Sequence, residues 1–207
     1  MNVYIWTSGV LKNDYIGEVF EYSYDFRGKS VAKMQSDGWN IFLNSNYAIF
    51  NSNWINTNST NNAIMAKIEN LNSIIKNSKK ITLSFTGAIT NAFSGRLSLF
   101  NEATSSTRRW ITWPYASNYG SSIQTSLYTT DITDSRTVNS TMKVTTVLDF
   151  TAKTWKTTAT DGYSRSGTLT DTQISNIKDN SKWFYIFAST STSNTNWGLT
   201  SIYVLVE

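Results

Sequence analysis

Residues 142–150 read Met-Lys-Val-Thr-Thr-Val-Leu-Asp-Phe, and this segment gives the strongest indication of the fold class. Met142, Val144, Leu148 and Phe150 alternate with residues that are mostly polar, and Thr146 continues the pattern between them. Successive side chains of a β-strand point to opposite faces, so the alternation predicts a strand with one buried face. It is the longest alternation in the chain.

Shorter segments of the same kind lie on both sides of it. Strands are expected at residues 2–6, 18–26, 81–87, 97–99, 108–113, 123–128, 154–158, 163–169, 182–189 and 198–206. Pro114 is expected to end the strand before it, because proline cannot donate to a sheet ladder. Asp131 and Asp134 are expected in a turn. Short strands at regular intervals, with polar turns between them, indicate a sandwich or a barrel.

Two short helices are expected among the strands. Ser30 as N-cap and Gly38 after the last turn predict a helix over residues 30–37. Thr170 followed by Gln173 predicts a capping box and a helix over residues 170–179. Residues 62–77 stay open, because their isoleucines and Leu71 share one helical face whereas residues 63–68 also fit a short strand.

Composition favours the same architecture. Hydrophobic residues make up 40% of the 207 residues and charged residues only 15%, while 79 residues are Asn, Ser or Thr. Threonine and aromatic residues suit a half-buried pleated surface, and Asn and Ser suit turns. The fold class predicted is therefore an all-β, antiparallel, two-sheet β-sandwich with one or two short helices. Residues 1–19 are interpreted as an N-terminal assembly or anchoring arm, and residues 20–207 as the sandwich domain.

The chain contains no cysteine and no histidine. Disulfides, thiolate chemistry, Ser-His-Asp catalysis and the usual zinc and copper sites are thereby excluded. A glycosidase built from carboxylates alone remains an alternative, but Glu18 and Glu21 would point to opposite faces of a strand. Oxygen-rich loops around Asp131, Asp134 and Asp161 are weighed as calcium ligands against ordinary Asx turns, which are preferred. We expect no enzymatic activity, no cofactor and no metal.

Charge and hydropathy limit the classes of binding partner that are expected. The net charge is +4 and the basic residues are scattered, so nucleic acid is not an expected partner. No apolar run is long enough to span a membrane. The first 14 residues do not have the pattern of a secretory signal.

Two segments resemble the concanavalin A-like (laminin-G-like) jelly-roll sandwiches. One is Tyr24-Asp-Phe-Arg-Gly-Lys-Ser30, followed by Asp37-Gly-Trp39, and the other is residues 143–155, with Leu-Asp-Phe, a turn and Thr-Trp. The resemblance covers residues 20–206 and implies the fold. The closely spaced acidic strand motif of the glycosidase members is missing. The Asn-, Ser-, Thr- and aromatic-rich composition is also similar to that of virion proteins of tailed phages.

Aromatic residues supply the candidate sites, because sugar rings stack on Trp and Tyr while polar groups bond their hydroxyls. The candidate glycan contacts are Arg109, Trp110, Trp113, Tyr115, Tyr119 and Trp197. The alternative for them is packing in the core or between subunits. The segment 182–189 is apolar on both faces, as expected of a central strand or of one pressed against another chain. The candidate interface residues are Tyr4, Trp6, Trp183, Tyr185 and Phe187.

Three functions follow in order of preference. The first is a non-catalytic virion structural protein of a tailed phage (capsid decoration, head fibre or tail-associated component) that is made in the host cytoplasm and assembles with other virion proteins or with copies of itself. The second is a carbohydrate-binding or receptor-binding lectin-like module, with a host surface glycan as partner. The third is a polysaccharide-degrading enzyme.

Overall fold

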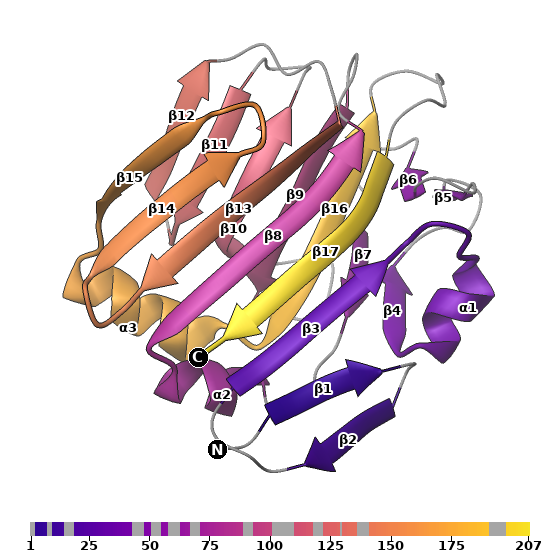
Figure 1. Cartoon of the computed structure of the whole chain (residues 1–207), viewed down its shortest axis with the longest axis horizontal. Helices are drawn as coiled ribbons and strands as arrows, with labels where there is room; N and C mark the ends of the chain where they lie inside the picture. Colours follow the sequence, from indigo (N-terminus) through magenta and orange to yellow (C-terminus); the bar gives the residue numbers. More distant parts are fainter. Residues whose placement is uncertain are drawn as a thin grey trace.

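The computed structural model describes most of the chain. The described residues are 3–7, 10–14, 19–42, 48–50, 55–57, 63–66, 71–88, 93–100, 110–117, 122–128, 130–135, 141–190 and 198–207. They form two stacked β-sheets and three short helices, which confirms the predicted β-sandwich. Figure 1 shows one sheet in front of the other.

The larger sheet has ten strands, in the order β15-β14-β13-β8-β17-β3-β1-β2, with β6 paired to β17 and β5 paired to β6. Its strands are β1 (Val3–Thr7), β2 (Val10–Asp14), β3 (Val19–Asp25), β5 (Ala48–Phe50), β6 (Ile55–Thr57), β8 (Lys80–Ala88), β13 (Thr141–Asp149), β14 (Thr154–Ala159), β15 (Ser164–Thr168) and β17 (Gly198–Val206). β1 pairs with β3 in parallel, whereas the other described pairs in this sheet are antiparallel.

The smaller sheet has seven antiparallel strands in the order β12-β11-β10-β9-β16-β7-β4. Its strands are β4 (Trp39–Phe42), β7 (Ala63–Ala66), β9 (Phe93–Phe100), β10 (Trp110–Ser117), β11 (Ser122–Leu127), β12 (Thr130–Ser135) and β16 (Trp183–Thr190). β16 lies between β9 and β7 and is therefore an inner strand.

The helices begin and end where local sequence dictates. In α1 (Val31–Ser36), Ser30 accepts from the Lys33 backbone N–H, and Gly38 follows with a φ of 89°, which a glycine adopts without strain. α3 (Asp171–Asn180) has the full capping box of Thr170 and Gln173. Residues 62–77 contain both alternatives in succession, namely β7 and then α2 (Leu71–Asn77).

Two sequence-based predictions were wrong about strands. Pro114 does not end a strand but lies within β10, where it is opposite Thr125. On the other side, the register with β9 shifts between Trp110 and Thr112, and such irregular ladders tolerate a missing N–H. Asp131 and Asp134 lie on the edge strand β12 rather than in a turn, because pairing with β11 outweighs their turn preference.

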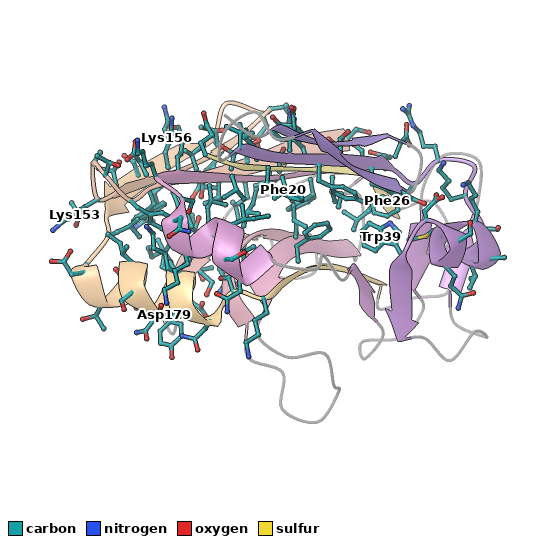
Figure 2. The ribbon with its side chains drawn as sticks, turned by 90° about the horizontal axis from the view of Figure 1, so that it is seen from below. Phe20, Phe26, Trp39, Lys153, Lys156 and Asp179 are labelled. Carbon is teal, nitrogen blue, oxygen red and sulfur yellow. The ribbon has the colours of Figure 1, made fainter. Side chains whose placement is uncertain are left out.

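The core fills the space between the sheets. The larger sheet contributes the buried alternating residues of β3, β8, β13 and β17, and the smaller sheet contributes Leu97, Leu99, Ile123, Leu127 and Phe184. Tyr22, Trp39 and Phe184 join the layers, since the Tyr22 and Phe184 ring centroids are 4.9 Å apart and Trp39 lies 6.0 Å from Phe184. Figure 2 shows Phe20, Phe26 and Trp39 between the sheets. Each fully buried large apolar side chain contributes roughly 1.5–3 kcal/mol.

Candidate functional site

Three of the aromatic residues predicted to contact glycan lie on the smaller sheet. Trp110, Trp113 and Tyr115 are on β10, an inner strand, where Trp113 pairs with Ser126 and Tyr115 with Gln124. Arg109, Tyr119 and Trp197 lie outside the described residues. Their assignment as glycan contacts stays a prediction.

The predicted interface residues lie on two strands. Tyr4 and Trp6 are on β1, which adds to the larger sheet beside β3, and Trp183, Tyr185 and Phe187 are on β16. Because β16 is hydrogen-bonded on both sides, its backbone edges are covered within the chain. The role of these five residues in assembly, and of the N-terminal arm, stays a prediction.

Two of the carboxylates weighed as calcium ligands bind neighbouring protein groups, and Glu18 of the weighed catalytic pair lies outside the described residues. Asp134 accepts a hydrogen bond from Tyr163 at 2.5 Å and pairs with Arg165, which joins the edge of the smaller sheet to β15 of the larger one. Asp161 accepts from the Tyr163 backbone N–H at 3.1 Å, as in an Asx turn. Across the described part of the chain, no three acidic, His or Cys side chains gather as a metal site would require.

The outer face of the larger sheet carries an extended arrangement of polar groups. Its central feature is a line of directly opposed residues on six adjacent strands, all with hydroxyl groups, which we call the hydroxyl row. From β3 to β15 it consists of Ser23, Tyr203, Ser84, Thr145, Thr158 and Ser164. Directly opposed residues share one face of a sheet, so the six hydroxyl groups lie together although they are distant in sequence.

Hydrogen bonds position three members of the hydroxyl row. The Ser84 and Thr145 hydroxyl oxygens are 2.9 Å apart, and Ser84 is buried by its neighbours. Tyr203, half-buried, donates to the Glu21 carboxylate at 3.0 Å. Burial and this hydrogen bond raise the pKa of Tyr203 to about 12, so the phenol remains a protonated donor at neutral pH.

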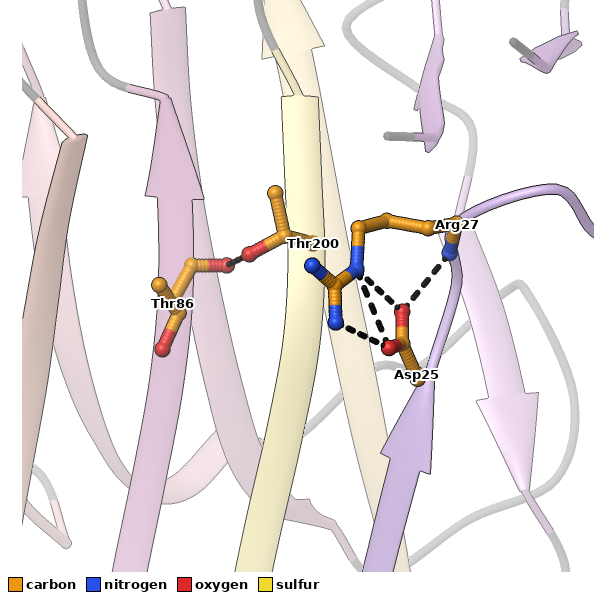
Figure 3. Close-up of polar contacts among 4 residues, drawn as sticks. All are labelled: Asp25, Arg27, Thr86 and Thr200. Carbon is orange, nitrogen blue, oxygen red and sulfur yellow. Dashed lines mark hydrogen bonds and ion pairs between the residues drawn. The ribbon is translucent and has the colours of Figure 1, made fainter. Parts of the chain in front are cut away.

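Charged groups border the row on both halves of the sheet. On the β3 side, Arg27 donates to both Asp25 oxygens, from Nε to Oδ1 at 2.9 Å and from Nη2 to Oδ2 at 2.5 Å (Figure 3). This hydrogen bonding holds the pKa of Asp25 below its usual range. Between the neighbouring inner strands β17 and β8, the Thr200 hydroxyl donates to the Thr86 carbonyl at 3.1 Å.

On the β13–β14 side, the neighbouring charges are lysines. Lys143 and Lys156 are both exposed, and neither forms an ion pair with any residue that the structure describes. Lys156 projects outward from the sandwich in Figure 2. The outer face thus carries carboxylates and an aromatic ring at β3–β17, whereas at β13–β14 the two exposed lysines share the face with one carboxylate, Asp149, which accepts from the Ala152 backbone N–H.

Sequence reasoning missed this face. Tyr203, Glu21 and Lys156 lie on three strands that were predicted separately, and nothing in the sequence indicated that these strands share one sheet. The signal that identifies the face is the strand register, because it sets β17 between β8 and β3. That register depends on contacts between residues far apart in the chain.

Comparison with known proteins identifies the fold. No protein-family model matches the chain, and no curated protein matches it. Trypanosoma rangeli sialidase in complex with sialic acid has a similar structure, with a TM-score of 0.57 and 9% identity over 99% of this chain and 33% of the sialidase. A T. rangeli sialidase mutant displaying trans-sialidase activity has a TM-score of 0.51 and 11% identity, over 80% of this chain and 27% of the mutant sialidase. The chain therefore spans about a third or less of these relatives.

A third solved structure matches nearly end to end. The CBM2 module of the Lactobacillus casei BL23 phage J-1 evolved Dit has a TM-score of 0.56 and 9% identity, over 89% of this chain and 94% of the module. At such low identity, the three likenesses establish a shared β-sandwich fold and nothing finer.

These likenesses correct one prediction. The conclusion that the chain is not an enzyme was wrong, because the same fold occurs within sialidases, which are enzymes. The lack of histidine and cysteine excludes catalytic mechanisms that need an imidazole or a thiol. Mechanisms that use carboxylate, tyrosine or arginine side chains are compatible with this composition. The likeness assigns no reaction to this chain.

Proposed function

We propose that this chain is a carbohydrate-binding β-sandwich module carried on the particle of a tailed phage, where it contacts a glycan of the host surface. The observation that carries the proposal is the half-buried Tyr203 ring on the outer face of the larger sheet, set beside the Glu21 carboxylate and within the hydroxyl row. An aromatic ring next to planar acceptors and hydroxyl groups matches a sugar, which has apolar C–H faces and a rim of hydroxyls.

The near end-to-end likeness to the phage Dit CBM2 module supports both parts of the proposal, since CBM denotes a carbohydrate-binding module. The Asn-, Ser- and Thr-rich composition without cysteine supports the virion part. Assembly through Tyr4, Trp6 and the β16 aromatics belongs to the same proposal. Among the described residues, no helix has the length and apolar character needed to cross a membrane.

A glycan array with the purified chain tests carbohydrate binding. We expect binding to at least one glycan, a change in tryptophan or tyrosine fluorescence on titration, and about tenfold weaker binding for Tyr203→Ala, equivalent to ~1.4 kcal/mol. Tyr203→Phe is the matched control, because it keeps the ring and removes only the hydrogen bond to Glu21. An array without hits and an unchanged fluorescence signal would contradict the proposal.

A second variant shows which of the two sheets carries the glycan-binding site. If Trp113→Ala abolishes glycan binding and Tyr203→Ala does not, the contact site lies at β10 in the smaller sheet rather than on the outer face of the larger one. The virion part is tested by mass spectrometry of phage particles purified from a culture that expresses the gene. We expect the chain to be enriched with the particles, and its absence from them would count against this part alone.

A further inference from the structure

We propose that the outer face of the larger sheet binds an acidic polysaccharide, whose chain lies across the strands along the hydroxyl row and whose anionic groups sit between Lys143 and Lys156. The proposal rests on the carbohydrate-binding function above. It adds the class of glycan, the direction of the chain and the residues that select for charge.

The direction follows from the hydroxyl row. Its six residues belong to six adjacent strands, so it runs perpendicular to the strands for about 24 Å at roughly 4.8 Å per strand. One strand spacing is close to the length of one pyranose unit in an extended chain. A polysaccharide lying along the row would therefore meet a hydroxyl-bearing residue at each strand except β8, where Ser84 is buried, and Tyr203 would offer a ring face near one end.

The negative charge expected of the bound polysaccharide follows from the positions of the two lysines. Thr145 and Thr158 are directly opposed, and Lys143 and Lys156 each lie two residues before one of them on antiparallel strands. The two ammonium groups therefore approach the threonine pair from opposite sides. A carboxylate or phosphate group above the pair would receive threonine hydroxyl donors and two flanking cations.

The opposite half of the face limits which polyanions fit. Glu21 and Asp25 are on β3, and Asp25 is already neutralised by Arg27 while Glu21 is held by Tyr203. A nucleic acid carries a charge on every nucleotide and would place phosphates against these carboxylates. A polysaccharide with spaced charges can place neutral sugars at β3–β17 and an acidic group at β13–β14, which favours the polysaccharide.

Binding to immobilised polymers tests the inference. Polygalacturonate, hyaluronan and poly(glycerol phosphate) serve as acidic probes, hydroxyethyl cellulose and dextran as neutral probes, and single-stranded DNA as a non-carbohydrate polyanion. We expect retention on at least one acidic probe, weakened by added salt because exposed charge pairs are screened. Lys143→Gln/Lys156→Gln should bind that probe about tenfold more weakly.

The matched control is Lys76→Gln/Lys182→Gln, which removes the same charge from exposed lysines outside the outer face, on α2 and just before β16. It should bind like the unmodified chain. Three results would overturn the inference: retention on neutral probes alone, equal binding by both double variants, or equal retention on DNA. If a polysaccharide is still bound in these cases, the proposed carbohydrate binding stands. Failure to bind any polysaccharide here or any glycan on the array would overturn the proposed function as well.

Discussion

Asp37 is a buried carboxylate that ties α1 to the larger sheet. It accepts hydrogen bonds from the Tyr24 hydroxyl at 2.8 Å and from Lys33 Nζ at 2.5 Å. Burial alone would raise the pKa of Asp37, but the hydrogen bonds from Lys33 and Tyr24 outweigh it and lower the pKa below its ordinary value. The charged form is therefore the one that stabilises the fold.

The sign of this shift predicts how stability depends on pH. A carboxyl whose folded pKa lies below its unfolded value of ~3.9 stabilises the protein above that value, and the contribution is lost as pH falls through the folded pKa. Asp37→Asn should lower the free energy of unfolding by roughly 1.5–3 kcal/mol at pH 7, as expected for hydrogen bonds to a charged group. Urea unfolding at pH 7 and below pH 4 should show that the difference in the free energy of unfolding between the unmodified chain and Asp37→Asn becomes smaller in acid. Asp131→Asn, at an exposed site, should change little, and a constant difference at both pH values would contradict the explanation.

At the scale of elements, α3 depends on its first turn. Thr170 accepts from the Gln173 backbone N–H at 3.1 Å, and the Gln173 side chain accepts from the Thr170 backbone N–H at 2.9 Å. Ile177 anchors the helix to the core, and Lys178 lies over the Phe150 ring at 5.0 Å. The capping residues were predictable from sequence because they interact with neighbours only three positions away.

Loss of the cap should destabilise the protein measurably. Thr170→Ala removes the acceptor for an otherwise unpaired helix N–H and should cost about 1 kcal/mol. Thermal unfolding would show this as a lower Tm. Thr172→Ala, inside the same helix and exposed, should be neutral or slightly stabilising because alanine favours helix. Equal effects of the two substitutions would argue against capping as the cause.

At the scale of the whole molecule, buried hydroxyl groups join the two sheets. The Thr157 hydroxyl of β14 lies 2.6 Å from that of Thr146 in the same sheet and 2.6 Å from that of Thr125 on β11 in the other sheet. All three residues are buried completely. A chain of satisfied hydroxyls in a low-dielectric interior fixes how the two sheets are aligned.

This arrangement predicts a non-additive mutant series. Thr157→Val keeps the volume but leaves the Thr125 and Thr146 hydroxyls without this partner, so it should cost about 1–3 kcal/mol. The triple replacement of Thr125, Thr146 and Thr157 by Val removes the buried polar groups together and should recover most of that loss. Denaturant unfolding of both variants provides the measurement. A triple variant that is less stable than the single one would show that the hydroxyls contribute net stability.

Apart from β2, β4, β5, β6 and β12, the strands were predictable from the sequence, as were two of the helices and the all-β class. These follow from alternation and from capping, which act over a few residues, as in residues 142–150 and Thr170. Only the tertiary structure decided that Pro114 continues a strand, that Asp134 joins two edges and that six hydroxyl residues align across one face. The reason is physical: strand register and sheet order are set by packing between distant segments, and no local pattern encodes which strands become neighbours.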